Sequence, residues 1–417
     1  MIHRYPRQPR YIRQHRAIAG LALAAAAFGL TACSTSAGAE DSDATGADAS
    51  DAAQPRVALT YDGGLLVLDG TSFDVEADIA LAGFNRVNSA GDGRHVLVST
   101  EDGFQVLDTG AWTTTDGTHL VGDPELTDLV FEAPAPGHVV RHGDKTILFA
   151  DGTGDTTVFD TADLLEVGAE LPETETIASP AAHHGVSIEL ENGTLLTTIG
   201  TPDARTGVRV LDTDREEIAR NEECPSVHGE GAAADEIAVF GCSDGVLIYD
   251  DGEFTKIAAP DDYGRTGNQY VSDTSSIAVG DYNSDPDAEG YTLSAVTLID
   301  TVAKTLEVVN LPEGIEYTWR DVARTSSDDA LILGTDGALH VMNTETGELT
   351  ASYPVIDPWT GPVEWQDAHP ALIVLGDTAY VTEPSTNSIH AVDVTTGEVI
   401  NSAKLPATPN EIAVVTG

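Results

Sequence analysis

The chain has 417 residues, 41% of them hydrophobic, with 40 Gly and 20 Pro. It can bury a core, but turn formers are so frequent that long helices and coiled coils are disfavoured. Lys plus Arg number 20 against 69 Asp plus Glu, a formal charge of -49 at pH 7. So acidic a surface repels nucleic acid and anionic lipid headgroups, attracts cations and disfavours self-association, so we expect a monomer that does not bind polyanions.

The N-terminus has the pattern of a secretory signal peptide over residues 1–32. Five Arg and no acid occupy residues 1–16, and the apolar run that follows, 17–30, is too short for a comfortable membrane span. The run ends in Leu30-Thr31-Ala32-Cys33, which is similar to the lipobox of bacterial lipoproteins, where the cysteine is diacylated and becomes the new N-terminus. We therefore expect a lipidated Cys33 and an extracytoplasmic protein anchored to the bacterial cell membrane. The alternative is an ordinary cleavage site.

Residues 33–55 are predicted to be a disordered acidic linker. Their Ser, Ala, Gly, Thr and Asp leave almost nothing to bury, and their charges repel one another. The linker would hold the domain away from the membrane, which the protein then meets only through its lipid.

Two cysteines remain in the rest of the chain, Cys224 and Cys242. In an oxidising extracytoplasmic compartment we expect them to form a disulfide that closes a short loop. Two separate thiols or a metal-binding pair are the alternatives.

Residues 56–417 are organised by a repeated signature, an apolar strand that ends in Asp or Asn. The signature ends at Asp69, Asp108, Asp160, Asp212, Asp250, Asp300, Asn343 and Asp393. Successive ends lie roughly 40 to 50 residues apart, which is room for four short strands between Gly, Asp and Asn turns. The sequence thus predicts an all-β fold, a single β-propeller with eight blades of four antiparallel strands. Seven blades with one degenerate repeat is the alternative.

The two ends of this region are expected to close the ring. Residues 410–416 form an extra strand after the eighth repeat, while the first repeat, at Val57, lacks its innermost strand. The C-terminal strand would complete the N-terminal blade and remove an open sheet edge.

Histidines recur at one place in the repeats, just before or early in the first strand, which lines the central channel of a propeller. Alignment on the turn before the second strand brings to this place His138, His183, His184, His228, Asp321 and His369. The pattern does not decide which of His183 and His184 faces the axis. Convergent neutral imidazoles suit Zn²⁺, and Glu230 or Asp321 could supply a further ligand. Without metal, these side chains would be the hydrogen-bonded lining of a wet channel.

Other motifs are weaker. Residues 281–290 carry oxygen ligands at alternate positions, as at the start of a Ca²⁺ loop, but Pro286 stands where that loop needs Gly and the twelfth position has no Glu. A solvated acidic loop is the favoured interpretation. The sequence has no Gly-x-Ser-x-Gly elbow, Gly-rich phosphate loop or His-Glu-x-x-His motif, so we do not expect an enzyme.

Five stretches resemble one family, the AztD-type zinc metallochaperones. They are 84–98 (FNRVNSAGDGRHVLV), 135–140 (APGHVV), 183–187 (HHGVS), 227–230 (VHGE) and 368–370 (AHP). The resemblance implies a secreted β-propeller that binds zinc and hands it to the zinc-binding protein of an ABC importer. It also implies that the ligands include His138, His184, His228 and His369. The His-rich N-terminal stretch that family members can carry has no counterpart in 33–55, which holds acids instead.

The predicted function is an extracytoplasmic zinc metallochaperone that passes zinc by ligand exchange to the solute-binding protein of a zinc ABC importer. An incoming His or carboxylate would replace the ligands one at a time from the open side of the site, and protonation of the histidines should weaken binding below about pH 6. The alternative is a β-propeller scaffold or surface-interaction lipoprotein without tight metal. A third hypothesis is a propeller hydrolase or lactonase that uses a channel metal.

Overall fold

The computed structural model describes residues 47–165 and 170–417. The predicted signal peptide, Cys33 and most of the predicted linker lie outside the described residues. Within these residues, no helix is both long enough and apolar enough to cross a membrane. The helix α1 (Thr161–Leu165) and two short 3-10 helices, Ala234–Glu236 and Pro384–Thr386, are the helical elements of the described chain.

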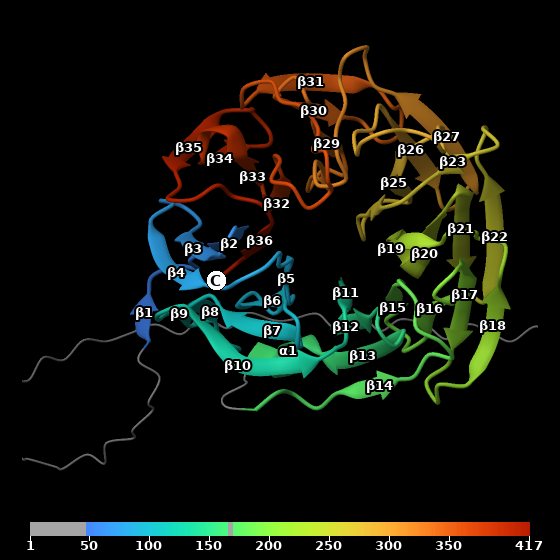
Figure 1. Ribbon diagram of the computed structural model, residues 1–417, viewed down its shortest axis with the longest axis horizontal. Helices are drawn as coiled ribbons and strands as arrows, with labels where there is room; N and C mark the ends of the chain where they lie inside the picture. Colours follow the sequence, from blue (N-terminus) through green and yellow to red (C-terminus); the bar gives the residue numbers. More distant parts are fainter. Residues whose placement is uncertain (1–46, 166–169) are drawn as a thin grey trace, which may run out of the picture. The chain divides into compact units, whose positions relative to one another are not determined.

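The described chain is a β-propeller, in which antiparallel sheets follow one another around a ring (Figure 1). In each sheet the innermost strand lies near the centre of the ring and the outermost strand lies at the rim. The first four sheets, from the innermost strand outward, are β36 (Ile412–Val415), β2 (Arg56–Tyr61), β3 (Gly64–Asp69) and β4 (Val75–Ala80); β5 (Val87–Ser89), β6 (His95–Ser99), β7 (Gly103–Asp108) and β10 (Glu125–Glu132); β11 (Pro136–His142), β12 (Lys145–Ala150), β13 (Asp155–Asp160) and β14 (Glu175–Ile177); β15 (Ser187–Glu189), β16 (Leu195–Gly200), β17 (Arg205–Leu211) and β18 (Glu217–Asn221).

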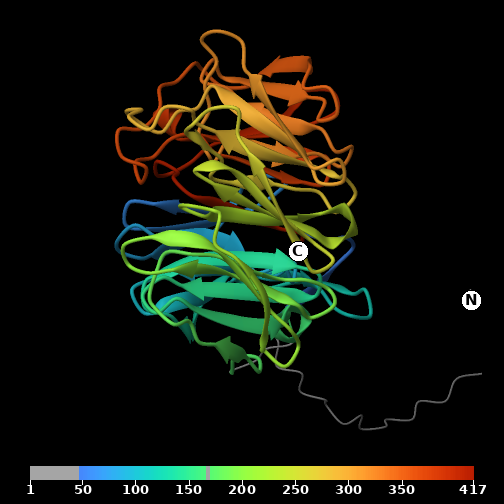
Figure 2. The same ribbon diagram turned by 90° about the vertical axis from the view of Figure 1, so that its right-hand side faces the viewer.

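The next four sheets have the same order. They are β19 (His228–Ala233), β20 (Ile237–Cys242), β21 (Asp244–Asp250) and β22 (Glu253–Ala258); β24 (Gln269–Tyr270), β25 (Ile277–Tyr282), β26 (Ala295–Asp300) and β27 (Thr305–Asn310); β28 (Val322–Arg324), β29 (Ala330–Leu333), β30 (Ala338–Met342) and β31 (Leu349–Pro354); β32 (Leu372–Leu375), β33 (Thr378–Glu383), β34 (Ser388–Asp393) and β35 (Val399–Lys404). In addition, β23 (Gly264–Arg265) pairs with β21 in parallel. Figure 2 shows the ring edge-on, with loops gathered at its two faces.

The repeated signature marks one strand of each sheet. Its Asp or Asn ends, or directly follows, the third strand from the centre in all eight of these sheets. A ninth sheet, of three strands, lies outside this series and consists of β1 (Asp48–Ser50), β9 (His119–Val121) and β8 (Ala111–Thr113). The blade count therefore stays a prediction. Strand β1 falls inside the segment predicted as linker, so the ordered chain begins before Val57.

The ring closes as the sequence predicted. Strand β36 pairs with β2, with Val57 opposite Val414, so the C-terminal strand becomes the innermost strand of the N-terminal sheet. The contact between this sheet and the last one is apolar, with Leu59 and Leu66 packed in one cluster with Ile389. Closure thus pairs an edge that would otherwise be open.

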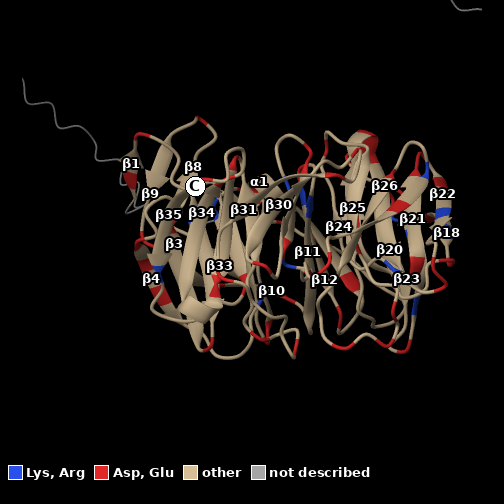
Figure 3. Cartoon of the chain, turned by 90° about the horizontal axis from the view of Figure 1, so that it is seen from above, with Lys and Arg blue, Asp and Glu red and all other residues tan. Residues whose placement is uncertain are grey.

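Burial follows strand position within each sheet. In the first sheet, the strands β2 and β3 are buried along nearly their whole length, while β4 at the rim alternates between exposed and half-buried residues. The inner strands are covered by neighbouring sheets on both faces, and this is why they are continuous apolar runs. Acidic residues are spread over the strands and loops of the ring, with few basic ones among them (Figure 3).

Candidate metal centre

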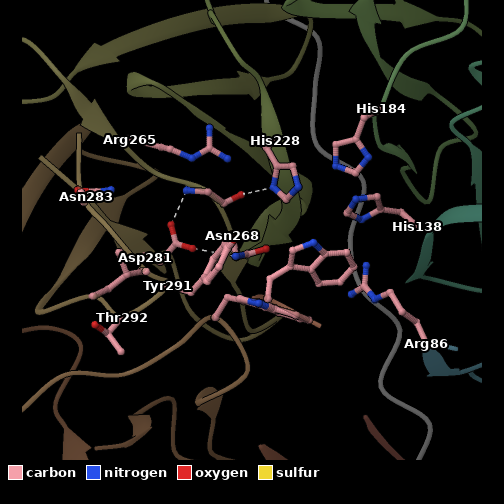
Figure 4. A pocket seen from close by; sticks show the side chains of 16 residues that line it. Arg86, His138, His184, His228, Arg265, Asn268, Asp281, Asn283, Tyr291 and Thr292 are labelled. Atoms are coloured by element: carbon pink, nitrogen blue, oxygen red, sulfur yellow. Dashed lines mark hydrogen bonds between the residues drawn. The ribbon is translucent and has the colours of Figure 1, made fainter. Parts of the chain in front are cut away.

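Three histidines converge near the axis and form what we call the histidine cluster: His138, His184 and His228. One nitrogen of each ring lies within 4.8 Å of the others. The ring centroid of His138 is 5.1 Å from that of His184 and 5.4 Å from that of His228. The ring centroids of His184 and His228 are 5.1 Å apart. Figure 4 shows the three rings turned toward one another. Within the described residues, the histidine cluster is the group of at least three potential ligands whose atoms lie close enough together to hold a metal ion.

Each ring comes from the start of an innermost strand in three successive sheets. His138 lies in β11, His184 lies just before β15, and His228 is the first residue of β19. A β-bulge next to His138 and another next to His228 shift the register of these strands. Bulges re-aim side chains, so they turn these two rings out of the regular alternation.

A glycine beside each bulged histidine makes the geometry possible. Gly229 has φ +65°, and a Cβ there would collide with the carbonyl oxygen of Gly267. A Cβ at Gly137 would collide with the carboxylate of Asp151. Both of these oxygens orient cluster histidines, so a larger residue at either glycine would displace the site's own hydrogen-bond partners.

Hydrogen bonds fix two of the rings. The Nδ1 of His184 lies 2.6 Å from Oδ2 of Asp151, and Nδ1 of His228 lies 2.7 Å from the carbonyl oxygen of Gly267. Both acceptors require Nδ1 to donate, which leaves Nε2 as the free lone pair. The Nε2 of His138 is buried and has no hydrogen-bond partner among the described residues. The arrangement therefore presents three ring nitrogens that no other protein group engages, each suited to a metal bond.

Burial keeps two of these imidazoles neutral. Desolvation lowers the pKa of His228 from 6.5 to about 3 and is also the main reason why the pKa of His138 lies well below 6.5. Nearby positive charges add to the effect, from Arg86 at His138, from Arg265 at His228 and from Arg205 at both. At neutral pH the lone pairs of both rings are free for a metal.

The donor set fits zinc. Zinc bonds to imidazole nitrogen at about 2.0–2.1 Å, which places tetrahedral ligands roughly 3.3 Å apart. Three nitrogens within 4.8 Å of one another reach this spacing with small ring movements. Carboxylate and carbonyl partners on the opposite ring nitrogens are the usual support of zinc-bound histidines. Three protein ligands leave the fourth position open.

The cluster faces a cavity of about 420 Å³, which we call the pocket. Besides the three histidines, its lining includes Arg86, Arg265, Asp281, Tyr291, Trp319 and Trp365. Of these six, only Asp281 belongs to a segment with the pattern of a metal site, the possible Ca²⁺ loop of residues 281–290. Trp319 is two residues from Asp321, which the repeats place near the start of an innermost strand. Repeats aligned on their turns do not tell which of the neighbouring residues faces the channel.

Two of the predicted histidines lie elsewhere. His183 is buried, with Nδ1 2.9 Å from the carbonyl oxygen of Ala181 and Nε2 3.1 Å from Oγ1 of Thr198, so both ring nitrogens are used. His369 is also buried and is bonded to the carbonyl oxygen of Asp367 at 2.7 Å. It lines a different cavity, so neither histidine joins the cluster.

The two predicted carboxylate ligands also stay outside the cluster. Asp321 accepts hydrogen bonds of 2.7 Å from the backbone and hydroxyl of Thr318, and its burial raises its pKa to about 7. Burial likewise raises the pKa of Glu230 to about 7. Because neither carboxylate lies with the three histidines, neither belongs to the proposed ligand set.

The acidic segment 281–290 forms no cluster of ligands within the described chain. Asp281 is buried, with its carboxylate bonded to the backbone of Gly267 and, at 2.8 Å, to the side chain of Asn268. It thus supports the segment whose carbonyl holds His228. Asn283 and Asp285 bond locally to backbone groups of the loop.

The predicted disulfide between Cys224 and Cys242 is present. Both cysteines are buried in the apolar cluster between the sheets of β17 and β20. The disulfide joins the segment between β18 and β19 to the end of β20, and the loop that it closes contains His228.

The chain is similar in sequence and in fold to a zinc chaperone. No family model matches the chain. A protein named zinc chaperone AztD, from Citrobacter koseri, is 23% identical over 298 residues, which are 70% of this chain and 69% of that protein. The solved structure of apo AztD from Citrobacter koseri has a TM-score of 0.73 at 19% identity and covers 88% of this chain and 98% of its own. A crystal structure of Citrobacter koseri AztD gives a TM-score of 0.72 at 20% identity with the same coverage. In sequence and in fold, the chain thus resembles the AztD-type zinc chaperones, as its sequence predicted.

Proposed function

We propose that this protein is a zinc metallochaperone that holds the ion on His138, His184 and His228. The observation that carries the proposal is the convergence of three free imidazole nitrogens, two of them oriented by Asp151 and by the carbonyl of Gly267. The similarity to a protein named as a zinc chaperone supports the same function. It also favours a role in binding and transport over an enzymatic one.

The finer proposal is that zinc passes to the solute-binding protein of a zinc ABC importer outside the cytoplasm, with the chaperone held at the membrane by a lipid on Cys33. The Cys224–Cys242 disulfide is compatible with that compartment. Retention at the membrane face would keep the chaperone near a receiving protein that is itself tethered.

Ligand exchange is the proposed mechanism of transfer, and the burial of the three rings gives it an order. The side chain of His184 is 42% exposed, whereas His138 and His228 are half-buried. An incoming ligand therefore reaches the open position first and displaces His184 before the other two. The ion moves without being released as a free cation.

The test of zinc binding is a competitive titration of the purified protein against a chelator. We expect about one tight zinc per chain, which is lost in the double variant His184→Ala/His228→Ala. His142→Ala is the matched control, because His142 lies on the same strand as His138 but pairs with Glu236. Absence of tight zinc in the unmodified protein would refute the proposal and favour a scaffold without metal.

The test of transfer mixes zinc-loaded protein with the metal-free solute-binding protein in the presence of excess chelator. Direct exchange predicts that the receiving protein gains zinc before the chelator does. If zinc appears only on the chelator, the ion is released first and the exchange mechanism is wrong, although zinc binding itself stands.

A further inference from the structure

The pocket beside the histidine cluster is lined by two arginines, although the protein is strongly acidic. Arg86 and Arg265 are both in the lining, next to the three histidines (Figure 4). The whole chain has 20 Lys plus Arg against 69 acids. Positive side chains next to a cation site oppose the cation, so their presence there needs a reason.

Neither arginine is neutralised by the protein. Among the residues that the structure describes, Arg86 and Arg265 form no ion pair, whereas Arg56, Arg94 and Arg215 each pair with a carboxylate. The Nε of Arg86 is buried without a hydrogen-bond partner. The guanidinium of Arg265 makes a hydrogen bond of 3.4 Å to the carbonyl oxygen of Ser226. Both therefore have donors available for an anion.

The acid in the pocket lining does not satisfy them. Asp281 is already engaged with the backbone of Gly267 and the side chain of Asn268. Burial raises its pKa, although the nearby charge of Arg265 acts in the opposite direction. One partly engaged carboxylate stands against two arginines and a zinc ion, so an anion from outside the chain would be attracted to the pocket.

The remaining walls suit an organic molecule. Trp319 and Trp365 line the pocket together with Tyr291. The guanidinium of Arg86 lies over the ring of Trp319, 5.2 Å from its centroid, and that of Arg320 lies 5.0 Å from the same centroid. A cavity of about 420 Å³ is in the range of small-molecule sites and far exceeds the space that one metal ion requires.

We propose that the pocket binds a small organic carboxylate with a planar apolar body, together with the zinc ion. Its carboxylate occupies the open fourth position of the zinc, where the charges of Arg86, on the side of His138, and Arg265, on the side of His228, both attract it, while its body lies against the tryptophans. This inference rests on the proposed function, because zinc is one of the groups that the carboxylate contacts. Zinc and carboxylate then strengthen each other's binding, and each dissociates more readily once the other is gone.

The experiment measures zinc affinity by chelator competition with and without benzoate, at constant ionic strength. We expect benzoate to tighten zinc binding by about tenfold, within the usual range of coupling between sites. Acetate, which lacks the ring, and benzyl alcohol, which lacks the charge, should have much smaller effects. Binding of benzoate to the metal-free protein is followed separately through tryptophan fluorescence.

The double variant Arg86→Gln/Arg265→Gln is compared with the unmodified protein for zinc affinity, once without benzoate and once with it. Without benzoate it should bind zinc at least as tightly as the unmodified protein, because two repelling charges are gone. With benzoate it should show no gain. Arg86→Lys/Arg265→Lys keeps the charges and should retain part of the gain, and Arg220→Gln, on an outer strand, should behave as the unmodified protein does. Thermal unfolding checks that all variants are folded.

The outcomes separate this inference from the proposed function. Tight zinc that does not respond to benzoate overturns the carboxylate site and leaves the zinc chaperone intact. Failure to bind zinc under either condition refutes the chaperone, and with it the joint site. Loss of zinc affinity in the glutamine variant without benzoate also overturns the inference, since the arginines would then support the site structurally.

Discussion

Two sides of the channel use the same position of the repeat in different ways. On one side, the three histidines of the cluster lie at or near the starts of β11, β15 and β19, and one nitrogen of each ring lies close to the others. On the other side, β28 and β32 begin next to Arg320, Asp321 and His369. There each polar group has one partner within the protein: Arg320 lies 2.6 Å from Glu411, Asp321 bonds to Thr318, and Nδ1 of His369 donates to a backbone carbonyl. The Nε2 of His369 is buried without a partner, but among the described residues it belongs to no group of three potential ligands.

The comparison shows that an inward position alone does not make a ligand. A metal site needs lone pairs that the protein leaves free and partners that hold the opposite ring nitrogen. Free ring nitrogens occur on both sides, but within the described chain only the histidine side brings three of them together. On the other side, the buried ion pair of Arg320 and Glu411, with the hydrogen bond of Arg320 to Asn410, joins the segment before β28 to the C-terminal strand.

The largest expected effect comes from removing two ligands of the cluster. His138→Ala/His228→Ala should abolish tight zinc binding. Removal of a group that only hydrogen-bonds to a ligand lowers metal affinity by up to roughly hundredfold, and removal of two ligands should lower it by much more. His369→Ala, on the opposite side, should leave zinc affinity unchanged. Chelator competition measures both. A large loss of zinc in His369→Ala would mean that the two sides act as one site.

The reverse experiment targets the opposite side. Glu411→Ala leaves the buried charge of Arg320 without its partner and should lower the free energy of unfolding by about 3–5 kcal/mol, with zinc affinity preserved. Denaturant titration measures the stability. The double variant Arg320→Met/Glu411→Leu, which removes both charges, should recover most of the loss. If it does not, the hydrogen bonds of Arg320 matter more than its charge.

A smaller effect is expected from the partner of His184. Asp151→Ala removes the acceptor at 2.6 Å from Nδ1 and should weaken zinc binding by about 10–100-fold. Asp160→Ala is the control, because Asp160 pairs with Lys145 on the outer part of the same sheet. Equal zinc affinity in the two variants would show that Asp151 does not orient the ring.

The smallest effect concerns pH. Because burial keeps the pKa of His228 at about 3 and that of His138 well below 6.5, protons do not compete for these two rings between pH 7.5 and 5.5. Zinc affinity should therefore fall by no more than about tenfold per pH unit, the slope of a single titrating ligand. The expectation from the sequence, that protonation of the histidines weakens the site below about pH 6, stays a prediction. A zinc titration across this range tests both, and a slope steeper than tenfold per pH unit would mean that more than one ligand takes up a proton.

Much of the architecture could be predicted from local pattern. Strands that end in Asp at a regular spacing indicate a repeated unit, and a surplus C-terminal strand indicates closure by β36. The disulfide of Cys224 and Cys242 followed from the expected compartment and the short spacing. These features are readable because strand periodicity and turn residues depend on the chain within one repeat.

The identity of the site depended on how separate repeats meet. The chain placed seven candidate ligands at or near inner strand starts, but only histidines from three successive sheets are near enough to share an ion. The pattern within a single repeat does not reveal which other residues approach the channel. Such residues include Asp151, Gly267 and the two arginines of the pocket. Convergence across repeats is a property of the closed ring, since it is set by the order and packing of the sheets around the axis.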